Sequence, residues 1–196
     1  MNLRSFFILC SFFLLINPLT GRTADFREYP IGDSIEKNHL NIAAVYFPAV
    51  VMDHSSMDHS MHHSMQKGDS AKELAKEKFV KPGHELVHIE ADIHATRGNP
   101  CGFGAGEWIP YLPVQYQLFK KGEKKPTLSG SFIPMVAKDG PHYGTTLRMP
   151  GKGSYRLEYR IGTPTIARHS DPVTGVSPYW KPFTVTFDFE YNGIPK

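Results

Sequence analysis

Strict alternation of apolar and polar residues recurs along this chain and restricts its fold more than any other feature. The segment 87–95 reads Val-His-Ile-Glu-Ala-Asp-Ile-His-Ala. Segments 114–118, 155–161 and 183–191 alternate in the same way, and the last carries aromatic residues on one face. Since successive side chains of a β-strand point to opposite faces, each pattern predicts a strand with one buried face.

Two further segments are less regular but still favour strands. The apolar run 41–51 is interrupted by Pro48, which predicts an edge strand or a bulged one. Segment 128–136 is another candidate. About seven short strands separated by Gly-rich and Pro-rich turns predict an all-β protein, an immunoglobulin-like β-sandwich with a long inserted loop. A closed β-barrel is the alternative.

The first residues have the features of a secretory signal peptide. One arginine, Arg4, precedes an apolar run over 6–16, which is too short to span a membrane. We expect residues 1–24 to be a signal peptide and residues 25–196 to be a single exported domain. No direct membrane insertion is expected after cleavage, and an uncleaved anchor is the alternative.

The charge balance excludes one class of partner. The chain has 22 Lys and Arg against 19 Asp and Glu. Removing Arg4 and Arg22 with the signal leaves 20 against 19, a net charge of +1. Nucleic-acid binding rests on clustered basic residues, so no nucleic-acid partner is expected.

Export of the chain also affects how its cysteines are interpreted. The chain has two cysteines, and Cys10 would leave with the signal. Cys101 would then be alone, so an intrachain disulfide is excluded. We interpret Cys101 as a loop thiol without a role. An intermolecular bridge or adventitious metal binding is the alternative.

A polar stretch between two predicted strands carries an unusual composition. We expect residues 53–82 to form an inserted loop with a short helix over 70–78. Residues 52–65 consist only of Met, Asp, His and Ser, and they hold four of the seven Met and four of the ten His. Thioether sulfur selects Cu(I) and imidazole also binds Cu(II), so the tract predicts a secondary copper site. Its candidate ligands are Met52, His54, Met57, His59, Met61, His62, His63 and Met65. A solvated linker is the alternative.

A second set of metal-competent residues lies on a predicted strand. Alternation over 87–95 places His88, Glu90, Asp92 and His94 on one face, where neighbours are roughly 7 Å apart. Imidazole and carboxylate groups at that spacing can converge on one ion, although an ordinary polar strand face has the same pattern. Elsewhere, a methionine lies in an apolar strand and two histidines lie in the turn 139–144 and the loop 167–171. Spacing alone does not connect these to the strand.

Several longer stretches resemble one protein family. They include Gly-Phe-Gly-Ala-Gly-Glu-Trp at 102–108, Asp-Gly-Pro-His-Tyr-Gly at 139–144, Pro-Met-Val-Ala at 134–137 and Trp-Lys-Pro-Phe at 180–183. From about residue 28 to residue 192, apart from the inserted loop, the chain resembles the periplasmic iron-transport proteins of the FetP kind, which work beside an Ftr-type inner-membrane iron permease.

The resemblance implies an immunoglobulin-like homodimer in the periplasm of a Gram-negative cell, which binds copper near the dimer interface. The implied copper ligands are His88, Met135 and His142, together with His169 contributed by the partner subunit. The resemblance also implicates Glu90 in the metal site and in iron binding, with Asp92 beside it. Hard carboxylate oxygens suit iron better than copper.

These observations lead to a functional expectation with alternatives. We expect a non-enzymatic copper-binding protein of iron uptake, which presents iron to an inner-membrane permease and receives copper from the tract. The tract departs from the family pattern and strengthens the copper role, so copper sequestration without iron flux is the alternative. A cupric oxidase of ferrous iron is a third interpretation. Against it, the sequence shows no second copper centre that would pass electrons on to oxygen. An adhesion sandwich is the fourth.

Overall fold

The computed structural model describes residues 27–53 and 81–195, and in these ranges it contains strands and no helix. The strands are β1 Tyr29–Pro30, β2 Ile35–Lys37, β3 Leu40–Pro48, β4 Leu86–Ala95, β5 Val114–Lys120, β6 Leu128–Ser131, β7 Ile133–Ala137, β8 Gly140–Arg148, β9 Gly153–Ile161 and β10 Phe183–Tyr191. Within the described part, no helix has the length and hydropathy that crossing a membrane requires.

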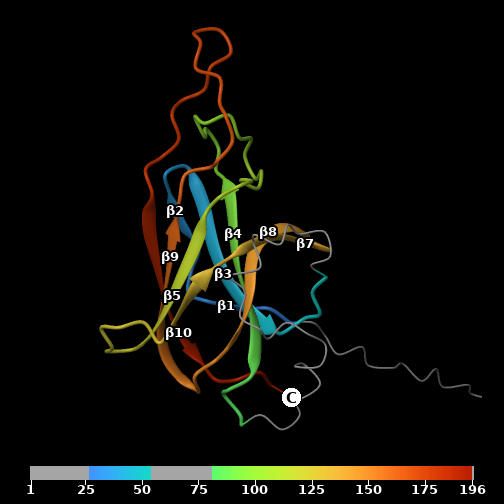
Figure 1. Cartoon of the computed structure of the whole chain (residues 1–196), viewed down its shortest axis with the longest axis vertical. Coiled ribbons are helices and arrows are strands. Elements are labelled where there is room, and N and C mark those ends of the chain that lie inside the picture. The colour runs from blue at the N-terminus through green and yellow to red at the C-terminus, as the bar shows by residue number, and fades with distance from the viewer. Residues whose placement is uncertain (1–26, 54–80, 196) are drawn as a thin grey trace, which may run out of the picture.

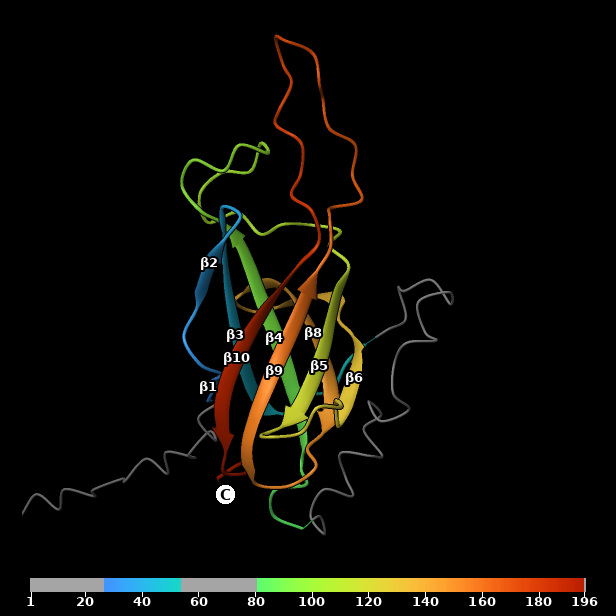
Figure 2. The ribbon, with the colours of Figure 1, turned by 90° about the vertical axis from the view of Figure 1, so that its left-hand side faces the viewer.

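The strands form two antiparallel sheets. One has the order β1-β3-β4-β8-β7, with β2 also paired to β3, and the other has the order β10-β9-β5-β6. Figure 1 shows the two sheets, and Figure 2 shows β10, β9, β5 and β6 side by side across the front of the molecule. The prediction of an all-β protein is therefore confirmed, and its two sheets are those of a sandwich rather than one closed barrel.

The core lies between the sheets and is rich in aromatic residues. Its largest fully buried side chains include Tyr143, Tyr155, Tyr159, Tyr191, Ile93, Leu118 and Leu157. Buried tyrosine hydroxyls need hydrogen-bond partners. The hydroxyl of Tyr143 donates to the carbonyl of Ile109 at 2.7 Å, and that of Tyr159 donates to the carbonyl of Glu90 at 2.9 Å. The second bond ties one sheet to the backbone of β4 in the other.

The four alternating segments form β4, β5, β9 and β10, close to their predicted bounds. The prediction that segment 41–51 forms an edge strand or a bulged strand is wrong. β3 ends at Pro48 and is interior, because it pairs with β4 on one side and with β1 and β2 on the other. Proline at the end of a strand costs no ladder bond, so Pro48 marks a boundary rather than an edge.

Segment 128–136 was wrongly predicted as one strand. It is two strands, β6 and β7, that belong to different sheets. The chain crosses between the sheets at Phe132, whose buried ring packs in the core against Tyr116 and Tyr159. β6 reads Leu-Ser-Gly-Ser and β7 reads Ile-Pro-Met-Val-Ala, with one residue between them, and only the long-range pairing shows that they are two strands.

Segment 139–144 was wrongly predicted as a turn around a histidine. Only its beginning is a turn, and β8 starts at Gly140 and contains His142. The predicted signal peptide over 1–24, the helix over 70–78 and most of the Met/His tract lie outside the described residues.

Candidate metal centre

Three buried polar side chains converge on the outer side of the larger sheet. His88 and Glu90 come from β4, and His142 comes from the neighbouring β8. Within residues 27–53 and 81–195, this is the one group of three or more His, Cys, Asp or Glu whose ligand atoms all lie within 4.8 Å of one another. Strand alternation aligns the first two, and the antiparallel β4–β8 ladder brings in the third.

The distances within the cluster place one carboxylate oxygen between two imidazoles. Glu90 Oε1 lies 2.9 Å from His142 Nε2 and 3.6 Å from His88 Nε2. The three residues are only 1% (His88) and 5% (Glu90 and His142) exposed. The alternation correctly placed His88 and Glu90 on the face opposite the core, but both side chains are buried there, whereas Asp92 and His94 on the same face are half-buried.

A methionine completes the donor set. Met135 is opposite His142 in the β7–β8 register. A Cβ added at Gly144 would stand 2.7 Å from His88 Nε2 and 3.2 Å from Met135 Sδ. The thioether sulfur and the His88 ring nitrogen therefore both lie over Gly144, in space that any larger residue would fill.

A hydrogen bond at Nδ1, the ring nitrogen that does not face Glu90, holds the His88 side chain. Its Nδ1 lies 3.1 Å from Thr146 Oγ1, and its Nε2 is buried without a hydrogen-bond partner among the described residues. Burial, followed by the charge of His142, lowers the pKa of His88 to about 4. The imidazole is therefore neutral at physiological pH, and a neutral ring with an unused nitrogen is the state that binds a metal.

The carboxylates affect His142 in the opposite direction. Burial lowers the pKa of His142, but its hydrogen bond with Glu90 and the charges of Glu90 and Asp92 outweigh burial and raise it overall. Burial and the Glu90 charge raise the pKa of Asp92, which lies beside the cluster on β4. A cation placed between these groups would replace the proton that His142 and Glu90 share.

The cluster lines a mostly apolar pocket of about 750 Å³. The other lining residues are Glu28, Phe47, Val50, Val51, Met52, Met135, Val136, Ala137, Lys138 and Asp139. Met52 is the first methionine of the Met/His tract, so the tract begins in the wall of this pocket. The remaining tract ligands, His54 to Met65, lie outside the described residues.

Sequence reasoning missed several residues of this site. The Thr146 hydroxyl hydrogen-bonds the His88 ring, and Gly144 leaves space beside it. Glu28 lines the pocket, and burial and the Glu90 charge raise its pKa. Thr146 and Gly144 could be found only from the pairing of β8 with β4, and no local sequence pattern reveals that pairing. Glu28 precedes a strand of two residues, and such a strand leaves no periodicity.

The remaining predicted residues lie apart from the cluster. His169 is in the long loop between β9 and β10, where its Nδ1 hydrogen-bonds Thr174 Oγ1 at 2.8 Å. His94 is at the end of β4, in an isolated bridge with Trp108. Cys101 is buried, its Sγ lies 3.6 Å from the carbonyl of Pro178, and burial raises the pKa of its thiol. These contacts agree with a thiol that serves packing.

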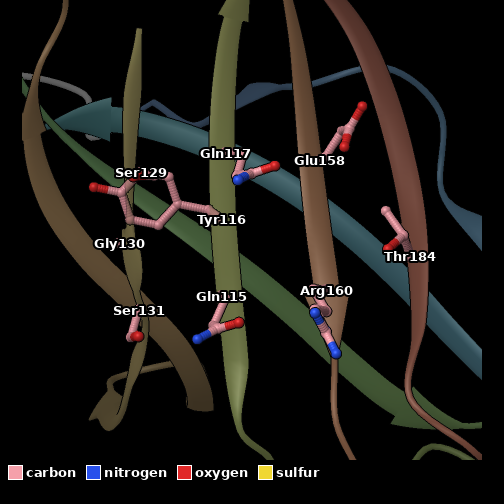
Figure 3. A pocket seen from close by; sticks show the side chains of 9 residues that line it. All are labelled: Gln115, Tyr116, Gln117, Ser129, Gly130, Ser131, Glu158, Arg160 and Thr184. Carbon is pink, nitrogen blue, oxygen red and sulfur yellow. The ribbon is translucent and has the colours of Figure 1, made fainter. Parts of the chain in front are cut away.

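A second hollow, of about 400 Å³, lies on the outer face of the other sheet (Figure 3). The lining side chains from β5, β6, β9 and β10 are mainly amides and hydroxyls, and Glu158 and Arg160 are the two charged residues among them. It brings together no imidazole or thiol, so its chemistry is that of a polar surface and not of a transition-metal site.

The donor set of the buried cluster fits copper. Imidazole and thioether ligands serve Cu(I), imidazole serves Cu(II), and a carboxylate favours the more highly charged ion. The unpaired Nε2 of His88 and the side-chain-free space over Gly144 are what a bound ion would use. The fold and this cluster define the class, a two-sheet β protein with a buried group of N, S and O donors that could hold a metal ion.

Comparison with known proteins then gives the family. The model of the Fe²⁺ transport protein family matches residues 25–67 and 67–193, so the chain belongs to that family. A UPF0423 protein of Brucella abortus is 35% identical over 180 residues, which cover 88% of this chain and 86% of that protein. The 34 kDa membrane antigen of Treponema pallidum is 35% identical over 178 residues, covering 87% and 77%.

Solved structures of relatives have the same fold. FetP of uropathogenic Escherichia coli strain F11 is 41% identical, with a TM-score of 0.68 over 87% of this chain and 99% of that one. A glutamate-to-glutamine variant of FetP, 40% identical, was solved with copper bound (TM-score 0.69; 86% and 100% covered). P19 of Campylobacter jejuni, 36% identical, was solved after copper reconstitution (TM-score 0.68; 87% and 99% covered).

Proposed function

We propose that this chain is a periplasmic copper-binding protein of iron uptake, which presents iron to an inner-membrane permease. The observation that carries the proposal is the buried, unpaired Nε2 of His88 beside Glu90, His142 and Met135. Membership of the Fe²⁺ transport family supports the role in iron uptake, and the copper-bound relatives support copper as the bound metal.

The residues would divide the work by their chemistry. His88, His142 and Met135 would hold copper in both oxidation states, because imidazole and thioether together accommodate both. Glu90, with Asp92 beside it, would supply hard oxygen donors for a second, iron-binding position. His169 of a second copy would complete the copper site, which makes the working form a homodimer.

The Met/His tract supports a role in copper supply. Met52 already lines the pocket that contains His88 and His142. Copper captured by the tract would therefore be released next to the ordered site. The same tract favours the second candidate function, copper sequestration without iron flux, since storage needs many weak soft ligands.

Cellular iron uptake separates the two functions. A host strain that lacks its own iron importers would carry the gene of an Ftr-type iron permease, with or without this chain, and uptake of radioactive iron at low iron would be measured. We expect uptake with the wild type and several-fold less with Glu90→Gln. Equal uptake with and without this chain would contradict the iron role and leave sequestration.

We further propose that the chain carries metal and does not turn over substrate. Oxidation of Fe(II) by oxygen would consume oxygen in proportion to the iron added. We expect the copper-loaded protein to oxidise at most about one equivalent of Fe(II) per copper and to consume no oxygen continuously. Continuous oxygen uptake would contradict the carrier proposal in favour of an oxidase.

A further inference from the structure

The long loop over residues 162–182, called the arm below, is ordered by its own hydrogen bonds. It projects from one end of the sandwich in both views (Figure 1, Figure 2). At its base, the Thr165 amide donates to the Tyr111 carbonyl at 3.1 Å and the Ser177 amide donates to the Pro100 carbonyl at 3.0 Å. The arm is therefore fixed to the loop that follows β4.

The tip of the arm is closed by its own hydrogen bonds. The Val176 amide donates to the His169 carbonyl at 3.0 Å, and the Gly175 amide donates to the Asp171 carbonyl at 2.9 Å. A Cβ on Gly175 would collide with that same carbonyl oxygen. The tip thus holds His169 in one defined turn.

A chain of hydrogen bonds inside the tip determines which nitrogen of His169 carries the proton. Asp171 Oδ1 accepts from the amides of Val173 and Thr174, both at 2.9 Å, so this carboxyl group acts as an acceptor. The Thr174 hydroxyl donates its single proton to Asp171 Oδ2 at 2.6 Å. Thr174 Oγ1 is then an acceptor for His169, whose Nδ1 lies 2.8 Å away.

We infer that Asp171 and Thr174 are positioning residues, which hold His169 as the Nδ1–H tautomer and present its Nε2 lone pair to the metal centre of a second copy. The inference rests on the proposed shared site. His88 is arranged in the same way, with a threonine hydroxyl at Nδ1 and a free Nε2. Metal-binding histidines commonly have the second nitrogen fixed by such a partner.

The first test measures the tautomer in the metal-free mature protein by ¹⁵N NMR of the imidazole nitrogens at a pH where His169 is neutral. We expect Nδ1–H in the wild type and in Thr174→Ser, which keeps the hydroxyl. In Asp171→Asn the amide would donate to Thr174, whose hydroxyl would then donate to His169 and move the proton to Nε2. An Nε2–H wild type, or an Asp171→Asn variant with unchanged tautomer, would overturn the inference.

The second test measures copper affinity in the same variants by competition with a chelator. We expect Asp171→Asn to weaken binding by about 10-fold to 100-fold and Thr174→Ser to retain it. Equal losses in both would indicate a merely structural turn and would overturn the inference. His169→Ala separates the two proposals: if it leaves copper affinity unchanged, the shared site fails, whatever the tautomer.

Discussion

Gly144 lacks a side chain at the point where two candidate metal ligands lie close together. It lies in the interior of β8, and an added Cβ would stand 2.7 Å from His88 Nε2 and 3.2 Å from Met135 Sδ. We predict that Gly144→Ala keeps the fold, because alanine is tolerated in a strand, yet displaces the two donors. Copper affinity should fall at least about tenfold, in the range seen when a ligand is misplaced. The measurement is chelator competition, with a thermal melt of the metal-free protein to verify folding. An unchanged affinity would show that His88 and Met135 do not share one ion.

Substitution of Met135 tests the role of the thioether, the soft ligand of the donor set. Met135→Leu nearly conserves side-chain volume, so the apo protein should stay folded. Only the thioether is lost, and Cu(I) depends on it more than Cu(II) does. We predict a larger loss of affinity for Cu(I) than for Cu(II), measured by competition in each oxidation state. Equal losses, or none, would count against Met135 as a ligand.

The pKa of His88 predicts a pH dependence of stability. It is about 4 in the folded protein against an ordinary value of 6.5, so between these pH values the unfolded chain binds more protons. Stability from the neutral ring is complete above about pH 6.5 and is lost as pH falls towards 4. We predict that the metal-free wild type loses more unfolding free energy from pH 7 to pH 5 than His88→Gln does, by urea titration. A parallel loss in both would contradict the buried, neutral assignment.

At the scale of elements, the tract and the ordered site can be separated. Met52 lies in the pocket wall, and the hydrogen bond and close contacts given above for His88, Glu90 and His142 are made within β4 and β8. We predict that deleting residues 55–64 lowers the number of copper ions bound per chain but leaves the ordered site filled. Metal analysis after equilibrium dialysis measures both. An empty ordered site would mean that the tract belongs to it.

The strands also show how much of the fold a local sequence pattern can predict. Period-two alternation identified β4, β5, β9 and β10 and the side of β4 that carries His88 and Glu90, because these strands each bury one face. The same reasoning failed at β6 and β7, which are adjacent in sequence and belong to different sheets. It also failed for β8, where glycine and proline concealed a strand containing His142.

Local sequence patterns therefore predicted only part of the candidate site. Alternation placed two of its groups on one strand face, and the family resemblance supplied Met135 and His142. Thr146, Gly144 and Glu28 depend on which strands pair and in which register, and a nine-residue pattern contains no information about that pairing.

At the scale of the whole molecule, the site and the arm belong to different regions. The cluster of His88, Glu90 and His142 is buried in the larger sheet, whereas His169 lies in a hydrogen-bonded arm that extends beyond both sheets. In the proposed homodimer, a second copy would supply its His169 to the cluster of the first. An ion held by both copies would stabilise the dimer by mass action.

This gives a prediction about assembly. Copper should tighten the dimer of the wild type at least about tenfold, since metal bound only to the assembled state shifts the equilibrium towards it. Sedimentation equilibrium with and without copper measures the change. His169→Ala should still dimerise but lose the copper effect. A copper effect that survives this substitution would contradict the shared site.

Titration of the mature protein with Cu(II), Cu(I), Fe(II) and Mn(II) tests the central claim most directly. The variants are His142→Ala and Glu90→Ala, with His39→Asn as the control, because His39 is exposed and its φ of 59° suits asparagine. The account predicts tight copper binding that is lost in His142→Ala, a second ion that is lost in Glu90→Ala, and a control like the wild type. Copper binding that survives in His142→Ala as it does in the control would contradict it.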